Sequence, residues 1–174
     1  MKTTPPCILV MGVSGSGKSH IGRDVASAIG AEFIDADDHH SPTSIAKMSR
    51  GEPLTDADRE GWLKTLSDFY RRYREDGKPL VIGCSALKHR YRDSLREGAP
   101  DLEILYLHGT REVLLERLNS RGAHFFAGEH MLDSQLNTLE PPDDNEAFRV
   151  DIRTDPATIV ARFIEHLKRA GFVD

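Results

Sequence analysis

Residues 12–19 read Gly-Val-Ser-Gly-Ser-Gly-Lys-Ser and match the pattern G-x-x-x-x-G-K-[ST]. They directly follow the apolar run of residues 8–11, which is typical of a buried strand. A strand, a glycine-rich turn and a helix opening at Lys18 form the context in which this pattern is a P-loop. The segment therefore predicts a site that binds the phosphates of a nucleoside triphosphate.

Each residue type in this loop has a chemical reason to be there. The glycines allow backbone conformations that bring successive N–H groups toward phosphate oxygens. The following helix presents its own unpaired N–H groups to the same anion. The lysine reaches the β- and γ-phosphates, and the final serine hydroxyl ligates Mg²⁺. We expect ATP to be bound by Gly12, Ser14, Gly15, Ser16, Gly17, Lys18 and Ser19.

A cluster of acids and histidines, residues 35–40, follows the second apolar run. In open α/β sheets, ligands bind beyond the carboxyl ends of the strands, so these side chains should face the P-loop. We assign Asp35 to Mg²⁺ and Asp37 to the acceptor hydroxyl, and we expect His40 to contact the acceptor. The alternative is a solvated acidic turn.

Three basic residues are candidates for holding an anionic acceptor. Lys88 and Arg92 are four residues apart on an expected helix, and would share one face of it. Arg59 lies early in another expected helix. Such a cationic group suits a carboxylate, although ordinary surface charge is an equal alternative.

Two further arginines flank a long irregular segment. Arginines placed there can hold the transferring phosphoryl group when a lid closes and excludes water. We expect Arg117 to contact the nucleotide and Arg121 to act in catalysis, with Gly122 as its hinge.

Short apolar runs alternate with helical patterns along the chain, which favours an α/β fold with a parallel sheet. The expected strands and helices are 8–11, 18–29, 32–34, 56–75, 80–84, 85–97, 103–107, 112–119, 150–152 and 156–170. Start signals for the helices include Thr55, Thr110 and the pair Asp155-Pro156. Two segments, 39–53 and 120–144, are expected to be irregular and to form the acceptor site and a lid.

Bulk properties narrow the class of protein. A chain of 174 residues suits one domain, which we place at residues 1–174 with residues 120–144 as an insertion. Its formal net charge of −5 argues against a nucleic-acid-coating protein. Cys7 and Cys84 are too few for a disulfide framework or a zinc site. With no signal peptide or membrane span expected, we predict a cytoplasmic protein.

Beyond the P-loop, four blocks resemble the gluconate kinases of the P-loop type, which are related to shikimate and nucleoside-monophosphate kinases. The blocks are residues 47–63, 84–93, 122–126 and 134–142. The resemblance implies a three-layer α/β/α P-loop kinase with a five-stranded parallel sheet and a mobile lid. It also implies ATP, Mg²⁺, transfer of phosphate to D-gluconate, and a homodimer.

The resemblance bears on individual residues as well. It supports Asp35 and Asp37 as the strand-end acids, Arg121 as the lid arginine, and Lys88 with Arg92 as the partners of the gluconate carboxylate. His40 keeps the family position, whereas Ala36 stands where many relatives have glycine.

Two other functions have to be weighed. A nucleotide or shikimate-type kinase would share the P-loop, but residues 41–61 offer no aromatic side chain for base stacking. A GTPase-like switch is suggested by residues 58–61, which match Asp-x-x-Gly, yet they lie in an expected helix and no Asn-Lys-x-Asp occurs.

Overall fold

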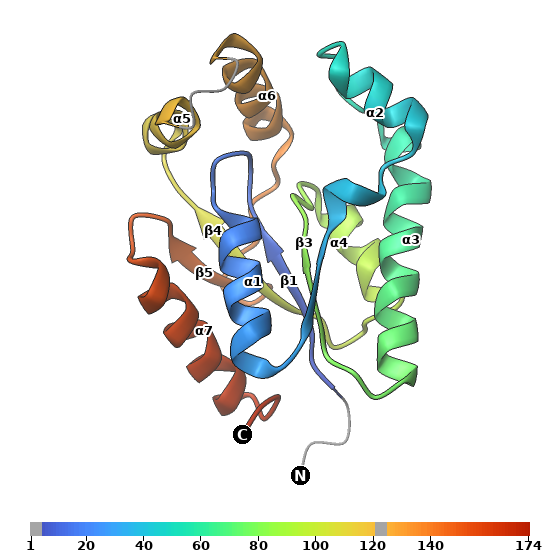
Figure 1. Ribbon diagram of the computed structural model, residues 1–174, viewed down its shortest axis with the longest axis vertical. Coiled ribbons are helices and arrows are strands. Elements are labelled where there is room, and N and C mark those ends of the chain that lie inside the picture. The colour runs from blue at the N-terminus through green and yellow to red at the C-terminus, as the bar shows by residue number, and fades with distance from the viewer. Residues whose placement is uncertain (1–4, 121–124) are drawn as a thin grey trace.

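Five parallel strands form one sheet in the computed structural model, which describes residues 5–120 and 125–174 (Figure 1). The strand order is β2-β3-β1-β4-β5, and every neighbouring pair is parallel. The strands are β1 (Cys7–Met11), β2 (Glu32–Asp35), β3 (Leu80–Gly83), β4 (Glu103–His108) and β5 (Phe148–Asp151). The expected α/β fold and five-stranded sheet are confirmed.

Within residues 5–120 and 125–174, seven α-helices and one short 3-10 helix, η1, connect and cover the strands. They are α1 (Lys18–Ile29), η1 (Ala36–His39), α2 (Pro42–Ser49), α3 (Asp56–Glu75), α4 (His89–Arg96), α5 (Arg111–Ser120), α6 (Phe125–Thr138) and α7 (Pro156–Arg169). No described helix combines the length and the apolar composition that crossing a membrane requires.

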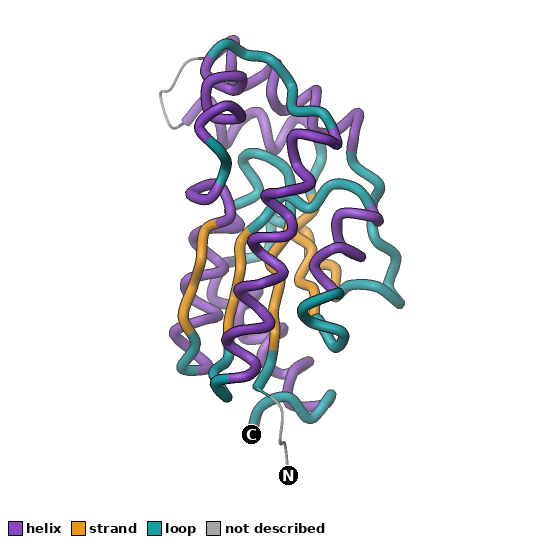
Figure 2. The backbone as a smooth tube through the Cα atoms, turned by 90° about the vertical axis from the view of Figure 1, so that its right-hand side faces the viewer, coloured by secondary structure: helices purple, strands orange, loops and turns teal. Residues whose placement is uncertain are grey.

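The helices form layers on the two faces of the sheet. Helices α1 and α7 lie side by side on one face, and α3 and α4 pack against each other on the other (Figures 1 and 2). At the carboxyl ends of the strands, α5 and α6 lie on one side of the loop between β1 and α1, and α2 lies on the other side (Figure 1). Strand β1 begins and α7 ends at the opposite end of the sheet, so the carboxyl edge is left to the functional loops (Figure 1).

Local signals set the starts of the helices as expected. The Thr55 hydroxyl accepts from the Asp58 N–H while the Asp58 carboxylate accepts from the Thr55 N–H, which completes a capping box. Asp155 caps α7 ahead of Pro156, and Thr110 accepts from the Val113 N–H. These interactions place the first turns of α3, α5 and α7.

Both segments expected to be irregular contain helices. Helix α2 begins after Ser41, whose hydroxyl accepts from the Ser44 N–H, with proline at the first helical position. Helix α6 spans residues 125–138, and its Leu132 side chain is fully buried. The expectation of irregular chain in these two segments was therefore wrong.

Helix α4 is shorter at its start than expected. Ala86 has a φ of 45°, in the left-handed region that an alanine side chain disfavours. Lys88 is the N-cap with extended backbone, so the helix begins only at His89. Lys88 and Arg92 consequently do not share a helical face.

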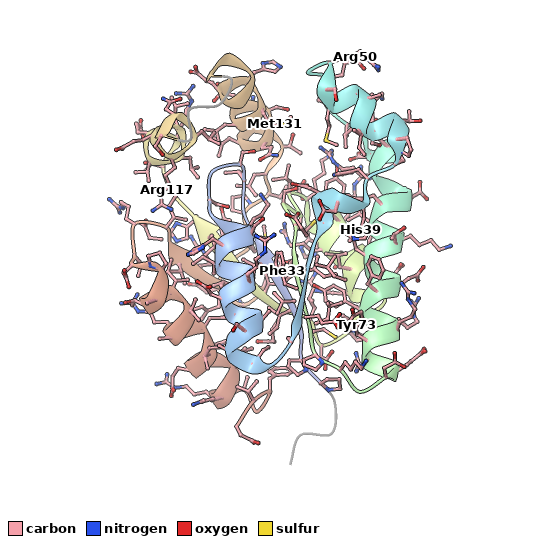
Figure 3. All side chains as sticks on the ribbon, in the orientation of Figure 1. Phe33, His39, Arg50, Tyr73, Arg117 and Met131 are labelled. Carbon is pink, nitrogen blue, oxygen red and sulfur yellow. The ribbon has the colours of Figure 1, made fainter. Side chains whose placement is uncertain are left out.

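Helix α1 packs closely on β2 and β3 at the edge of the core. The ring of Phe33, labelled in Figure 3, lies so close to Gly22 of α1 that a Cβ there would come within 2.4 Å of it. The buried residues of β1, β3 and β4 continue this core through the centre of the sheet. The P-loop thus follows a strand that is buried at every residue.

The chain just after α4 packs tightly against α3 at Gly98. A Cβ at Gly98 would lie 2.0 Å from the Ser67 carbonyl oxygen of α3. We expect Gly98→Ala to lower the free energy of unfolding by about 1–3 kcal/mol, because the helices must separate to admit a methyl group. Urea denaturation followed by circular dichroism measures this change.

Gly61, in the exposed middle of α3, provides the matched control. A Cβ there meets no heavy atom within 4 Å. Gly61→Ala should raise stability by up to about 1 kcal/mol through helix propensity alone. Equal effects of the two substitutions would contradict the close packing at Gly98.

Candidate active site

The loop between β1 and α1 has the conformation that phosphate binding requires. Gly15 and Gly17 have φ values of 86° and 87°, which a residue with a Cβ adopts only under strain. A Cβ at Gly12 would lie 2.4 Å from the Ser16 hydroxyl oxygen. Gly17 caps α1 without any side-chain hydrogen bond, so the first N–H groups of α1 remain available to an anion.

Ser19 and Asp35 meet at the end of this loop, as the sequence predicts for a Mg²⁺ site. The Ser19 hydroxyl donates to the Asp35 Oδ2 atom over 3.1 Å, and the Asp37 N–H donates to Oδ1 over 3.0 Å. A hydroxyl and a carboxylate are the oxygen donors that Mg²⁺ takes beside water and phosphate. The donor set therefore fits Mg²⁺.

Asp37 lies between the P-loop lysine and His40. The pKa of Asp37 is lowered chiefly by the neighbouring His40 imidazole, while burial opposes this and the positive charge of Lys18 adds to it. Its Oδ1 atom is 3.7 Å from the His40 Nε2 atom. The structure thus brings together Lys18, Asp37 and His40, and keeps Asp37 ionised at neutral pH.

Trp62 of α3 holds this acidic turn in place. Its indole Nε1 donates to the Ala36 carbonyl oxygen over 2.7 Å, and its ring stacks on His40 with 4.1 Å between centroids. The His40 Nδ1 atom is buried and has no hydrogen-bond partner among the described residues. An unsatisfied ring nitrogen of this kind can bind a hydroxyl group of a ligand.

One pocket lies beside the P-loop, between α2, α3 and α6. Met131, labelled on α6 in Figure 3, lines this pocket together with Met48 of α2. Its polar lining includes three residues that the sequence predicts for the acceptor, Asp37, His40 and Arg59. We call this space the acceptor pocket; it is also lined by Glu52, Pro53, Leu54, Trp62, Ser85, Leu87, Ser134, Gln135 and Thr138.

Lys88 and Arg59 lie together at the outer side of this pocket, where both line a neighbouring groove. The Lys88 ammonium donates to the carboxylate of Asp56 over 3.1 Å, and it shares this carboxylate with Arg90. Arg59 donates to the neutral hydroxyl of Tyr91 over 3.0 Å. Of these two cations, Arg59 keeps more of its charge available for a ligand.

Arg92 does not contact the acceptor pocket, and its predicted role is corrected. Its side chain is 1% exposed, and its guanidinium donates five hydrogen bonds within the protein. Two of them go to the Glu146 carboxylate, and three go to the carbonyl oxygens of Ala86, Leu87 and Glu140. Because a guanidinium has five N–H groups, none remains for a gluconate carboxylate.

Of the two arginines assigned to a lid, the structure describes Arg117 but not Arg121. Arg117 of α5 donates to the carbonyl oxygen of Ile152, just after β5, so it lies on the side of the P-loop opposite α2. Its predicted contact with the nucleotide stays a prediction. Arg121 lies outside the described residues.

The sequence-based assignment missed Gln135. The Gln135 Oε1 atom of α6 accepts from the Ser14 N–H of the P-loop over 2.6 Å. Residues 134–142 formed one of the blocks shared with the kinase family, but no chemistry in the sequence indicated a role for this amide. Only the fold shows that α6 reaches the P-loop.

A P-loop on a five-stranded parallel sheet, with an acidic turn and a second pocket beside it, defines a P-loop kinase. Residues 7–142 match the family model described as an AAA domain. The chain is 44% identical to the thermoresistant gluconokinase of Escherichia coli over 163 residues, which cover 92% of this chain and 93% of that protein.

Two solved structures agree with this match. A gluconokinase from Sinorhizobium meliloti superimposes with a TM-score of 0.82 at 42% identity, covering 97% of this chain and 99% of that one. A sugar kinase from Janibacter has a TM-score of 0.88 at 43% identity, covering 94% and 95%. The chain belongs to the gluconokinase family.

The burial of Arg92 leads to a prediction about stability. Arg92→Met should lower the free energy of unfolding by about 3–5 kcal/mol, because it leaves the Glu146 carboxylate and three carbonyl oxygens without this donor. Arg96→Met should cost less, because Arg96 is a more exposed partner of the same carboxylate. A stable Arg92→Met protein with only a raised KM for the acceptor would contradict this structural role.

The same ion pair should make stability depend on pH. Burial alone raises the pKa of Glu146, but hydrogen bonds from Arg92 and Arg96 outweigh it and lower the pKa from 4.5 to about 2. Because the pKa of Glu146 is lower in the folded state, this carboxylate stabilises the fold at pH values above its unfolded-state pKa. Its contribution to the free energy of unfolding is lost as the pH falls from about 4.5 toward about 2. Urea denaturation should therefore show wild type and Glu146→Gln furthest apart near neutral pH and converging in acid. A pH-independent difference would contradict the ion pair.

Proposed function

We propose that this protein transfers the γ-phosphoryl group of ATP to the C6 hydroxyl of D-gluconate, forming ADP and 6-phospho-D-gluconate. The observation that carries the proposal is the acceptor pocket, which adjoins the P-loop and combines Asp37, His40 and Arg59. Relatives of this chain over nearly its whole length are gluconokinases.

The nucleotide half of the reaction uses the P-loop. Backbone N–H groups of residues 12–19 and the Lys18 ammonium bind the phosphates of ATP and stabilise the charge that develops on the transferring group. Ser19 and Asp35 hold Mg²⁺, which neutralises charge on the β- and γ-phosphates. The hydrogen bond between these two residues supports this assignment.

In the acceptor half, Asp37 orients the attacking hydroxyl. The C6 oxygen forms a bond to the γ-phosphorus, the bond from that phosphorus to the β,γ-bridging oxygen breaks, and the hydroxyl proton is released. The lowered pKa of Asp37 makes its carboxylate a weak base, which favours orientation over early proton removal. His40 offers its unpaired Nδ1 atom to another hydroxyl of the sugar acid.

Arg59 is the main partner that we propose for the gluconate carboxylate. It lines both the acceptor pocket and the groove that holds Lys88, and its hydrogen-bond partner Tyr91 is neutral. Lys88 assists from the outer edge, where it already pairs with Asp56. Arg92 acts on this site only by supporting the chain around Ala86 and Leu87.

Other acceptors fit the pocket less well. A nucleoside monophosphate needs an aromatic face for its base, but His40 already stacks on the buried Trp62. A GTPase-like switch would use Asp58, yet this carboxylate is engaged by the Thr55 N–H and by Lys47 within α3 and α2. Both observations favour a sugar acid.

Several expectations from the family resemblance belong to this proposal. We propose a single catalytic domain that acts as a cytoplasmic homodimer, with Arg117 and Arg121 closing over the phosphates. Light scattering on the purified protein tests the dimer. Substitution of each arginine in turn tests the lid.

The activity is tested by measuring ADP release from Mg²⁺-ATP with gluconate, shikimate or a nucleoside monophosphate as acceptor. We expect gluconate alone to stimulate ADP release and phosphate to appear on its C6 oxygen. Lys18→Met serves as the inactive control. Stimulation by another acceptor, with none by gluconate, would overturn the proposed function.

Asp37→Asn should lower kcat by about 100-fold or more, because a neutral amide orients the hydroxyl less strongly than a carboxylate. Gluconate binding should change little, which the fluorescence of Trp62 can measure, since it is the single tryptophan and lines the pocket. Asp38→Asn is the matched control, because Asp38 is the next acid of η1 but does not line the acceptor pocket. Equal losses in both variants would contradict the role of Asp37.

A further inference from the structure

The amide of Gln135 joins the two halves of the site. Its Oε1 atom accepts from the Ser14 N–H over 2.6 Å, and the same side chain lines the acceptor pocket with Asp37 and Arg59. Gln135 comes from α6, whereas its partners come from the P-loop, η1 and α3. It thus contacts the phosphate-binding backbone and faces the acceptor at once.

This contact engages an N–H group that belongs to the phosphate-binding loop. Charge-assisted hydrogen bonds are roughly twice as strong as neutral ones, so a phosphate oxygen competes effectively with the amide oxygen for the Ser14 N–H. When nucleotide takes this N–H, the Gln135 amide loses its partner. It then has one acceptor and two donors free beside a pocket that suits a hydroxyl-rich ligand.

We propose that Gln135 is a positioning residue that couples nucleotide binding to acceptor binding. Without nucleotide its amide is held by the P-loop, and with ATP bound it turns to the hydroxyl groups of the sugar acid. The proposal rests on the proposed function, because it takes gluconate as the acceptor. By linkage, each substrate then strengthens binding of the other by the same factor.

The coupling can be measured without catalysis. Trp62 stacks on His40 in the acceptor pocket, so its fluorescence should report gluconate binding. Gluconate is titrated into the full-length protein with Mg²⁺, first alone and then with a saturating non-hydrolysable ATP analogue. We expect the analogue to lower the Kd for gluconate in the wild type by about fivefold or more.

Gln135→Leu removes the amide while keeping a side chain of similar size. The analogue should then change the Kd for gluconate by less than about twofold. The variant should bind the analogue alone as tightly as the wild type or up to about tenfold more tightly, because the internal competitor is gone. His130→Leu, a polar-to-leucine change at an exposed position of the same helix that lines neither the acceptor pocket nor the groove beside it, should leave the coupling intact.

Gln135→Glu gives a second and opposite readout if the leucine variant does not fold. A carboxylate binds the Ser14 N–H more strongly and repels the γ-phosphate. The affinity of the Gln135→Glu variant for the ATP analogue should fall several-fold, and the affinity of the same variant for ADP should fall less. Affinities unchanged from the wild type would overturn the competition between Gln135 and phosphate.

The outcomes separate the two proposals. If wild type responds to gluconate and Gln135→Leu keeps its full coupling, or if wild type shows no coupling, the role of Gln135 is wrong and the proposed function stands. If gluconate changes neither Trp62 fluorescence nor ADP release, the proposed function fails and the coupling proposal fails with it.

Discussion

The buried guanidinium of Arg92 is the interaction on which the acceptor half of the molecule depends. It bonds the carbonyl oxygens that follow β3, the carbonyl oxygen of Glu140 after α6, and the carboxylate of Glu146 before β5. A buried charge is costly unless it is paired and fully hydrogen-bonded, and this one is both. A lysine, with three donors and a single charged nitrogen, could not satisfy five acceptors in these directions. The strained backbone at Ala86 is held by the same network.

A smaller network organises the nucleotide half. The Asp35 carboxylate binds the Ser19 hydroxyl with one oxygen and the Asp37 N–H with the other. One side chain therefore fixes both the last residue of the P-loop and the turn that carries Asp37. Trp62 supports that turn from α3 through Ala36 and His40. The spacing between the P-loop and Asp37 is thus held by Asp35 from one side and by Trp62 from the other.

Features that depend on neighbouring residues could be predicted from the sequence, whereas those that depend on distant partners could not. The P-loop, the strands and the caps at Thr55 and Asp155 follow from local patterns, and the structure confirms them. Helix α2 has a local start signal, the N-cap Ser41 followed by Pro42, but the mixed composition of residues 39–53 favoured an irregular segment. The role of Arg92 could not be read locally, because Glu140 and Glu146 lie about fifty residues away along the chain. Gln135 was missed for the same reason, since its partner Ser14 is 121 residues distant.

The strand order divides the chain into two consecutive blocks around β1. Residues 32–97 supply β2, β3 and most of the lining of the acceptor pocket, and residues 103–169 supply the strands and helices on the other side of the P-loop. Most of the lining of this pocket is therefore encoded in one uninterrupted stretch of sequence. Exchanging that stretch between related kinases would also exchange Asp35, the partner of Ser19 in the P-loop. The junctions to be kept compatible in such an exchange include that contact, the pairing of β3 with β1, the contacts of Arg92 with Glu140 and Glu146, and the face that α6 presents to the pocket.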